Sequence, residues 1–326
     1  MATRQTALVL GAAGGIGGEV ARQLRDAGWE VSGLVRSLER PMLARDGIVW
    51  MRGDAMRPDD VERAAEGCAV IVHAVNPPGY RRWAELVLPM LDSTIAAAKR
   101  EGAVIVLPGT VYNYGPDVFP LIREDAPQRP LTRKGAIRVE METRLRAYAA
   151  DGGRALIVRA GDFFGPNAGN NWFSQGLIQP GKAIRRIQNP AAPGVGHQWA
   201  YLPDVAGNIV ALLARRESLE PFAVFHLGGH WDADGEQMAQ AIRRVLQGHG
   251  VDVKVSAFPW WLIRLIAPFN VTLKEMMEMR YLWRRPVRMD NGKLLGVLGR
   301  ETVTPLEEAV AQTLRGLGCL PGGARG

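Results

Sequence analysis

The sequence predicts an α/β protein: a doubly wound parallel sheet with a smaller C-terminal α/β lobe. In the first half, short runs rich in β-branched residues alternate with helical patterns, which is typical of a parallel sheet wrapped by crossover helices. A glycine-rich turn directly follows the first of these runs. After Gly161 the alternation weakens and Gly, Pro and Asn become frequent, which indicates loops that carry short elements.

The first half of the chain accounts for most of the expected regular structure. The run Val70-Ile71-Val72 is apolar without interruption, as expected for a strand covered on both faces. The expected strands cover residues 7–10, 31–35, 48–52, 70–74, 104–107 and 155–159. The helices between them are expected at residues 17–26, 58–66, 83–100 and 134–150.

The C-terminal part is expected to hold fewer elements. The indicated ones are a strand at residues 224–227, a helix at residues 236–246 and a final helix at residues 305–317. The segment 258–269 is unusually apolar. Because this segment is short for a membrane span and contains Arg264, we expect it to pack within the lobe and not against a membrane.

Composition limits the classes of protein to consider. With 326 residues, of which 47% are hydrophobic and 22% charged, the chain can bury one large core or two adjoining ones. No stretch approaches the roughly 20 apolar residues of a membrane span, and the N-terminal residues lead directly into a strand-like run. We therefore expect a cytoplasmic protein without a membrane partner. Cys68 and Cys319 are far apart and lack histidines at ligand spacing, so neither a disulfide framework nor a metal site is expected.

The charge favours small anionic ligands. The formal net charge is +7, and an excess of Lys and Arg raises the local concentration of phosphates and carboxylates. Basic residues occur as scattered pairs, such as Arg185-Arg186, without a long basic tail or a nucleic-acid-binding motif. We therefore expect solvated surface charge and a small-molecule substrate, and no nucleic-acid partner.

The glycine-rich turn lies between a predicted strand and a predicted helix. Glycines at such a junction allow a tight turn and let the backbone approach a pyrophosphate, while the helix N-terminus offers N–H groups to the anion. In this strand–loop–helix context the turn predicts a Rossmann dinucleotide site. Its expected cofactor contacts are Gly11, Ala13, Gly14, Gly15, Ile16 and Gly17.

The end of the second predicted strand indicates which dinucleotide binds. Sites selective for NAD usually place an acid here for the ribose hydroxyls. This chain has Arg36, whose guanidinium can pair with the 2′-phosphate of NADP, and Ser37 can add a donor. After the third strand, Asp54 and its neighbour Ala55 are expected at the adenine, where Asp54 either accepts from the amino group or caps a turn. The expected cofactor is therefore NADP(H).

These motifs resemble the extended short-chain dehydrogenase/reductase family, which includes nucleotide-sugar epimerases and dehydratases. The glycine spacing at residues 11, 14 and 17 is similar to that of the family. Further similar segments are residues 53–54, 66–74, 159–166, 198–206 and 225–228. The resemblance extends over nearly the whole chain and implies the same fold.

The family's catalytic set is a Ser or Thr after the fifth strand and a Tyr-x-x-x-Lys motif on the next helix. By resemblance, Thr110 occupies the Ser/Thr position, whereas Lys134 stands at the tyrosine position and Arg138 at the lysine position. Glu142 matches a glutamate that the family often has, which supports this alignment. The chain therefore resembles atypical members of the family that lack the catalytic tyrosine.

These replacements change the available chemistry. Arg138 can hold the nicotinamide ribose but cannot act as an acid or base at ordinary pH. Lys134 can take over proton transfer, because desolvation and a like charge four residues away both favour release of its proton. Alternatively, Lys134 is a solvated lysine at a helix start. Tyr112 and Tyr114 either supply a phenol or serve as packing aromatics.

The remaining site residues lie in segments expected to face the cleft. A loop at residues 76–79 is expected to border the nicotinamide, while His73 before it is expected to be packed in its strand. Further expected cofactor contacts are Ala74, Val75, Asn76, Pro108, Gly109, Lys134, Ala160, Gly161 and Phe163. Each expected substrate contact can instead serve in packing or capping. These contacts are Asn76, Tyr112, Asn113, Asp162, Phe163, Asn171, Trp172, His197 and Trp199.

Two functions are compatible with the sequence. One is an NADP(H)-dependent reductase-, epimerase- or dehydratase-type enzyme that acts on a carbonyl-type or anionic compound, and the other is a catalytically silent protein that binds or senses NADPH. The polar and aromatic loop region 161–200 favours a small-molecule pocket, and hence the enzyme. We expect an NADP-binding domain at residues 1–165 and about 197–228, and a substrate-binding lobe at about 166–196 and 229–326. Helices near residues 84–100 and 137–150 suggest a homodimer by resemblance, although burial against the sheet demands the same apolar pattern.

Overall fold

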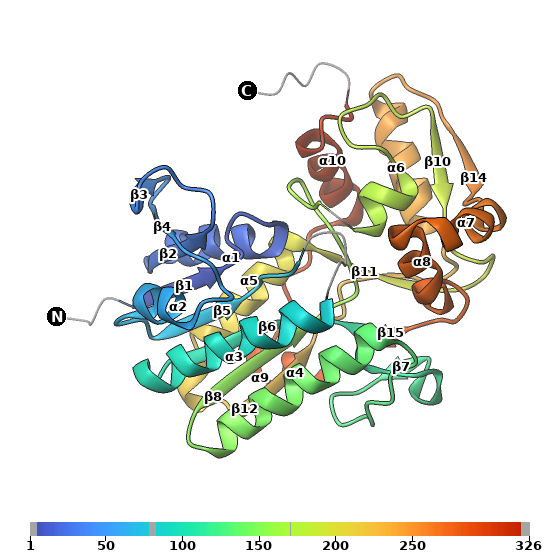
Figure 1. The fold of residues 1–326 in the computed structure, drawn as a ribbon. Helices are drawn as coiled ribbons and strands as arrows, with labels where there is room; N and C mark the ends of the chain where they lie inside the picture. Colours follow the sequence, from blue (N-terminus) through green and yellow to red (C-terminus); the bar gives the residue numbers. More distant parts are fainter. Residues whose placement is uncertain (1–4, 78–82, 170, 321–326) are drawn as a thin grey trace.

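The computed structural model describes residues 5–77, 83–169 and 171–320. Its centre is an eight-stranded sheet in the order β12-β8-β6-β5-β1-β2-β4-β3 (Figure 1). Neighbouring strands are parallel except β3 and β4. The strand order changes direction between β1 and β5, and the carboxyl ends of these strands therefore border a crevice. The doubly wound α/β fold predicted from the sequence is confirmed.

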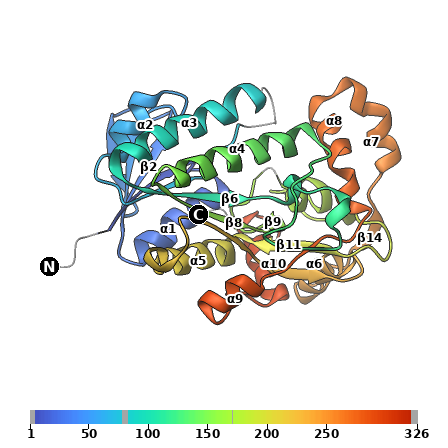
Figure 2. The same cartoon turned by 90° about the horizontal axis from the view of Figure 1, so that it is seen from below.

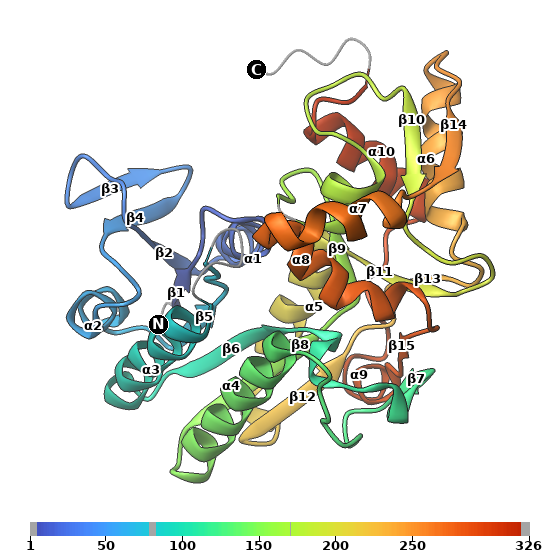
Figure 3. The same ribbon diagram turned by 45° about the vertical axis from the view of Figure 1, so that its right-hand side comes forward.

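The predicted strands of this sheet are all present, and their ends lie within two residues of the predicted ones. The strands of the large sheet are β1 (Thr6–Leu10), β2 (Glu30–Val35), β3 (Met42–Arg45), β4 (Ile48–Arg52), β5 (Val70–His73), β6 (Val104–Gly109), β8 (Arg154–Arg159) and β12 (Phe222–His226). The only one of them that the sequence pattern did not indicate is β3. It pairs antiparallel with β4 through a turn in which Asp46 and Gly47 both have positive φ, 55° and 71°. Figure 3 shows this hairpin at the outer edge of the sheet.

Helices cover both faces of the sheet (Figure 2). One face carries α1 (Gly15–Asp26) and α5 (Leu202–Leu213), and the other carries α2 (Pro58–Ala65), α3 (Trp83–Glu101) and α4 (Arg133–Ala150). Along β1, Ala7 and Val9 belong to the apolar cluster on the first face, while Leu8 and Leu10 belong to the cluster on the second. Burial on both faces explains why the strands are apolar without alternation.

A third cluster of buried residues fills the C-terminal lobe, where many of the side chains are aromatic. Its small sheets are β13-β11-β9, β10-β14 and β15-β7. The strands are β7 (Leu121–Ile122), β9 (Asp162–Phe164), β10 (Arg186–Asn189), β11 (His197–Tyr201), β13 (His230–Asp232), β14 (Lys254–Ala257) and β15 (Arg288–Met289). The helices are α6 (Gln237–Gly248), α7 (Trp260–Ile266), α8 (Val271–Glu278) and α10 (Leu306–Gly316), whereas α9 (Gly292–Leu298) packs against β12 of the large sheet. Short helical turns are η2 (Val111–Asn113), η3 (Pro116–Val118), η4 (Phe173–Leu177), η5 (Arg216–Ser218), η6 (Ala267–Phe269) and η7 (Met279–Trp283).

The apolar segment 258–269 does not pack into the lobe as expected. Phe258 and Ala267 are buried, but Trp261, Leu265 and Phe269 are 69%, 63% and 90% exposed. The expectation is wrong for this face because α7 contacts the lobe on one side only, through residues such as Trp260, whose indole Nε1 donates to the Pro190 carbonyl at 2.9 Å. In the part of the chain that the structure describes, no helix has the length and apolar character needed to cross a membrane.

Candidate active site

A large cleft of about 1140 Å³ opens at the carboxyl ends of the central strands. It exceeds the roughly 300–1,000 Å³ of most small-molecule sites, so an extended ligand can lie in it. The predicted cofactor residues that line it are Gly11, Ala13, Gly14, Gly15, Ile16, Arg36, Ser37, Asp54, Ala55, Ala74, Val75, Asn76, Pro108 and Phe163. Pro78 and Gly79, from the expected nicotinamide loop, lie outside the described residues.

The glycine turn brings the backbone close to the end of the neighbouring strand. Gly11 has a φ of +87°, and a Cβ at this position would lie 2.6 Å from the carbonyl oxygen of Ala74. A side chain at Gly17 would collide with the backbone of Gly11, so Gly17 supports the turn without lining the cleft. Gly14 caps α1 without a side chain, which leaves the N–H groups of the first helical turn available to an anion. The turn therefore has the form that a diphosphate requires.

Cations border the far end of the cleft. Arg36 and Ser37 follow β2 and are exposed, and among the described residues no acid pairs with Arg36. The hairpin adds Arg45, which lies with its guanidinium 5.4 Å from the centre of the Trp50 ring and also lines the cleft. Asp54 lines it as well, and its Oδ1 accepts from the backbone N–H of Met56 at 3.0 Å. The turn-capping alternative for Asp54 is therefore correct, and it does not remove the carboxylate from the cleft.

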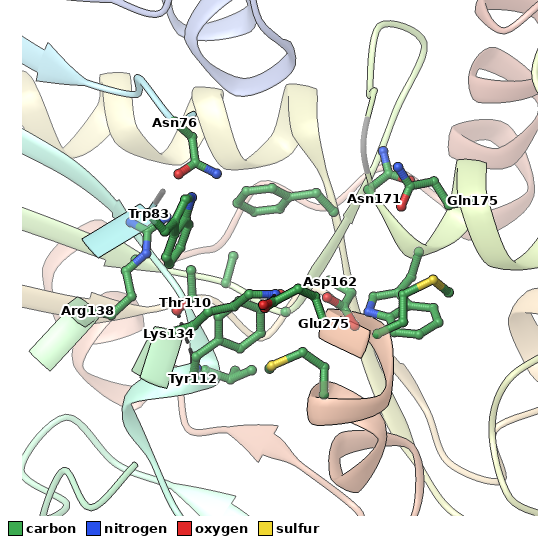
Figure 4. A pocket seen from close by; sticks show the side chains of 18 residues that line it. Asn76, Trp83, Thr110, Tyr112, Lys134, Arg138, Asp162, Asn171, Gln175 and Glu275 are labelled. Atoms are coloured by element: carbon green, nitrogen blue, oxygen red, sulfur yellow. Dashed lines mark hydrogen bonds and ion pairs between the residues drawn. The ribbon is translucent and has the colours of Figure 1, made fainter. Parts of the chain in front are cut away.

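A second, smaller cavity of about 160 Å³ adjoins the cleft (Figure 4). The two cavities share Asn76, Thr110, Arg138, Phe163 and Asn171. The other predicted site residues that line the small cavity are Gly109, Tyr112, Lys134, Ala160, Gly161, Asp162 and Trp172. Because these side chains border one space at the end of the cleft, the small cavity is the candidate substrate pocket.

Lys134 projects into this pocket from α4 and meets a carboxylate from α8. Its Nζ lies 2.7 Å from Oε2 of Glu275, and the side chains of the two residues are 6% and 23% exposed. Figure 4 shows the pair spanning the pocket. The burial excludes the alternative of a solvated lysine at the helix start. The sequence argument considered only the neighbouring cation Arg138, whereas an opposite charge also stands beside the amine.

Arg138 lies on the other side of the pocket from Glu275. Its guanidinium carbon is 5.1 Å from the centre of the Trp83 ring, which fixes the orientation of the arginine. Burial and the charge of Arg138 lower the pKa of His73 to about 3, so that this histidine is neutral. Its Nδ1 lies 2.8 Å from Oγ1 of Thr94 in the core, as expected for a packed strand residue.

Thr110 and Tyr112 occupy the pocket wall nearest the sheet. The Thr110 hydroxyl oxygen accepts from the backbone N–H of Tyr112 at 3.3 Å and starts the short turn η2. The Thr110 carbonyl accepts from the fully buried Arg159 at 2.6 Å. The turn η2 therefore positions the Thr110 hydroxyl at the pocket, and the buried Arg159 guanidinium fixes the backbone of the same residue.

Asp162 is positioned in the pocket by a histidine from the lobe. Nε2 of His197 lies 2.8 Å from Oδ2 of Asp162, and the imidazole stacks on Trp283 with ring centres 3.8 Å apart. His197 is buried and lines neither cavity. His197 therefore orients Asp162, and the prediction that it contacts the substrate is wrong.

Three further candidates lie behind the pocket. Asn113 is completely buried, and its amide donates to Glu142 at 2.8 Å and to Gln128 at 3.1 Å. Tyr114 is also fully buried, and its hydroxyl faces His226. Trp199 is 2% exposed within the aromatic cluster of the lobe. The prediction that Asn113 and Trp199 contact the substrate is therefore wrong. Of the two alternatives for Tyr114, the structure supports the packing aromatic and not the phenol that donates a proton to the substrate.

Sequence reasoning missed the side chains that distant segments contribute. Trp83 and Gln175 line the pocket, and so do Glu275, Met276 and Met279 from the α8–η7 region. Nothing in the spacing of Glu275 relates it to Lys134, because 141 positions separate the two residues along the chain. The mixture of apolar and charged residues at 273–283 is typical of a helix, but it does not indicate that this helix borders the pocket. Among the described residues, no group of three or more His, Cys, Asp or Glu side chains is arranged to hold a metal ion.

The fold and the cleft define a nucleotide-binding protein of the Rossmann type. The profile of the NAD dependent epimerase/dehydratase family matches residues 7–228, and the chain belongs to this family. The resemblance to extended short-chain dehydrogenases/reductases is therefore confirmed. Enzymes characterise the family, and a nicotinamide dinucleotide is supported as the cofactor.

Solved structures share the fold at low sequence identity. The chain is similar to UDP-N-acetylglucosamine 4-epimerase from Bacillus cereus, with 15% identity, a TM-score of 0.72 and coverage of 95% of this chain and 98% of that one. It is similar to MoeE5 in complex with UDP-glucose and NAD, with 18% identity, a TM-score of 0.70 and coverage of 96% and 98%. The chain is also similar to WbmH from Bordetella bronchiseptica in complex with NAD⁺, with 16% identity, a TM-score of 0.70 and coverage of 98% of this chain and 100% of that one. A search of curated proteins found no match.

Proposed function

We propose that this protein is an NADP(H)-dependent oxidoreductase or epimerase/dehydratase-like enzyme that acts on a compact carbonyl-type or anionic substrate. The observation that carries the proposal is the buried Lys134–Glu275 pair, which borders a pocket that opens into the dinucleotide cleft. A buried ion pair in the wall of a ligand cavity is costly unless the groups serve a role there.

The cofactor residues fit a phosphorylated dinucleotide. The N-terminus of α1 would hold the diphosphate, and Asp54 and Ala55 would border the adenine. Arg36 and Ser37 would hold the 2′-phosphate, and Arg45 supplies a second cation at the same end. MoeE5 and WbmH are in complex with NAD, whereas the cationic rim supports NADP for this chain.

Lys134 is the proposed proton carrier. When bound, the nicotinamide supplies or accepts a hydride at the substrate carbon. The Lys134 ammonium would donate its proton to the oxygen or nitrogen that gains it, or the free amine would accept the proton in the reverse direction. Glu275 would orient the amine, and Thr110 would hydrogen-bond the same substrate atom. Arg138 would hold the ribose side of the junction.

The size of the pocket supports a compact substrate. A cavity of about 150 Å³ holds a molecule the size of benzene, and this pocket measures about 160 Å³. Its far wall is closed by Trp172, which packs against Trp260 and Trp283 with ring centres 5.7 and 5.1 Å away. We therefore propose a small polar compound as the substrate, in contrast to the UDP-glucose bound to MoeE5 and the UDP-N-acetylglucosamine for which the Bacillus cereus epimerase is named.

The alternative is a silent NADPH-binding protein. The observation that favours it is the same ion pair, because an ammonium held at 2.7 Å by a carboxylate must give up that contact to transfer a proton. This alternative predicts tight NADPH binding and no turnover with any substrate. Two further proposals stand with either function: the division into an NADP-binding domain and a substrate lobe given above, and the homodimer.

The test is NADPH oxidation with a panel of compact aldehydes, ketones and 2-oxo acids, compared between the parent protein and Lys134→Ala. Loss of a proton carrier lowers turnover by about 10²- to 10⁴-fold, while NADPH affinity stays within about twofold. Lys182→Ala, at an exposed lysine of the lobe, is the matched control and should retain full turnover. Full activity of Lys134→Ala would contradict the assigned role. Tight NADPH binding would favour the silent alternative if the panel gives no NADPH oxidation and if hydroxy compounds incubated with NADP⁺ are neither epimerised nor dehydrated.

A further inference from the structure

Helix α7 and the turn η6 present an apolar face to solvent. The face consists of Trp261, Leu262, Leu265, Ile266 and Phe269, and is called the α7 face below. Trp261, Leu265 and Phe269 are spaced four residues apart, and Leu262 and Ile266 lie beside them, so all five fall on one side of a helix. Figures 1 and 2 show α7 and α8 side by side at the outer end of the C-terminal lobe. Solvated proteins rarely leave so many large apolar side chains together without a partner.

Several cations lie on α7 and in the segment that follows it. Arg264, Lys274, Arg284 and Arg285 are exposed, and no acid among the described residues forms an ion pair with them. The guanidinium carbon of Arg280 lies 5.2 Å from the centre of the Trp260 ring at the start of α7, and Arg280 borders one cavity with Arg284 and Arg285. The region therefore has an excess of positive charge next to its apolar residues.

The two acids of α8 already have partners on or near α4. Glu275 pairs with Lys134 in the pocket, and Oε1 of Glu278 accepts from the backbone N–H of Arg133 at 3.0 Å. Glu278 also borders a cavity together with Arg280, Arg284 and Arg285, so one carboxylate there faces three guanidinium groups and the charge beside the α7 face stays positive. A partner that covers this face must therefore supply negative charge together with an apolar surface.

We propose that the α7 face docks the protein onto the surface of an anionic lipid bilayer. Trp and Phe side chains settle at the level of the lipid headgroups, and Leu and Ile reach the start of the acyl chains. Arg264, Arg284 and Lys274 then meet lipid phosphates, and each basic residue adds to the attraction of an anionic leaflet. Docking leaves the helix in the plane of the interface, requires no spanning segment, and needs neither cofactor nor turnover.

A second copy of the chain fits this face less well. A two-fold symmetric contact brings the same patch of both copies together, so the α7 face would meet itself. Arg264 and Arg284 of one copy would then approach those of the other, and this repulsion opposes a symmetric contact. The charge of the surface favours a phosphate-rich partner over self-association.

The experiment is co-sedimentation of the protein with vesicles of phosphatidylcholine alone, and with vesicles in which about a third of the lipid is phosphatidylglycerol. The parent protein should bind the anionic vesicles, and binding should weaken as salt is raised. The double variant Trp261→Ser/Phe269→Ser and the double variant Arg264→Glu/Arg284→Glu should each bind at least about tenfold more weakly. Thermal unfolding of each variant checks that the fold is retained, since these side chains are exposed.

Matched controls lie far from the α7 face. Met42→Ser removes another exposed apolar residue, on the β3 hairpin, and Arg300→Glu reverses another exposed charge, after α9. Both should bind vesicles like the parent protein. The proposal is overturned if the parent protein ignores anionic vesicles, or if the α7-face variants bind them as tightly as the controls do. It is also overturned if light scattering finds a dimer that Trp261→Ser/Phe269→Ser dissociates, because the face then covers a second copy.

Discussion

The proposed cofactor cleft and the proposed substrate pocket of this protein are built by different means. The cleft is formed by backbone at the ends of parallel strands, and its most restrictive positions are glycines such as Gly11 and Gly17. The pocket is formed by side chains that α4 and α8 bring together from distant parts of the chain, as Lys134 and Glu275 illustrate. A site made of backbone depends on a local motif, whereas a site made of side chains depends on the packing of the whole lobe.

The largest effect is expected from the backbone of the cleft. Gly11→Ala places a Cβ 2.6 Å from the Ala74 carbonyl at a φ of +87°, so the turn must move away from the strand that it borders. We expect NADPH affinity to fall by at least about 100-fold, roughly 3 kcal/mol, in a fluorescence titration. Gly28→Ala is the control: Gly28 has the same φ of +87°, but no atom lies within 4 Å of its added Cβ. If both variants bind NADPH like the parent protein, the glycine turn does not cradle the diphosphate.

The choice of dinucleotide gives the next largest effect. Arg36→Ala removes the cation at the end of β2, and a lost charge-assisted hydrogen bond is worth about 2 kcal/mol, or roughly 30-fold. NADPH affinity should fall by this amount while NADH affinity changes little, as measured by titration with both nucleotides. A parent protein that prefers NADH would show that Arg36 is only a solvated residue at a strand end.

Sequence patterns predicted the parallel sheet because its strands are buried on both faces, and a run such as Val70-Ile71-Val72 has no other common explanation. They did not predict β3, whose exposed residues carry no period that distinguishes a strand from a loop. They also placed the α7 face inside the lobe, because an apolar segment does not reveal whether a partner for it lies in the same chain. The residues of the pocket were likewise only partly predictable, because a local pattern does not reveal which distant segment packs against it. Local motifs located Thr110 and Arg138, but only the fold located Glu275 and removed Asn113.

Two buried histidines of the nucleotide-binding half should make stability depend on pH. Burial lowers the pKa of His73 and of His226 from 6.5 to about 3, with a smaller contribution from Arg138 and from Arg159 respectively. A histidine that is neutral when folded and titrates at pH 6.5 when unfolded gives stability that is present above pH 6.5 and is lost as the pH falls towards 3. Below pH 6.5, each of the two histidines should lower the free energy of unfolding by about 1.4 kcal/mol for every unit by which the pH falls.

Urea unfolding above about pH 5, where most carboxylates remain ionised, isolates this effect. His73→Gln should reduce the slope of the unfolding free energy against pH by about 1.4 kcal/mol per unit. His249→Gln, at an exposed histidine, controls for the loss of any histidine. An unchanged slope in His73→Gln would mean that His73 takes up its proton in the folded protein as readily as in the unfolded chain.

The smallest effect is expected where a side chain supplements the cleft from the edge of the sheet. Arg45 is 63% exposed, is 3.7 Å from Asp46 and lies over Trp50, so its contact with a 2′-phosphate is screened by water and shared with an acid. Arg45→Ala should therefore weaken NADPH binding only about threefold, and this loss should disappear at high salt. Arg36→Ala should retain most of its loss at high salt, because a direct hydrogen bond is less screened than a distant charge. Equal salt sensitivity in the two variants would mean that both arginines act as general positive charge, and the hairpin would then contribute to nucleotide choice as much as the strand end does.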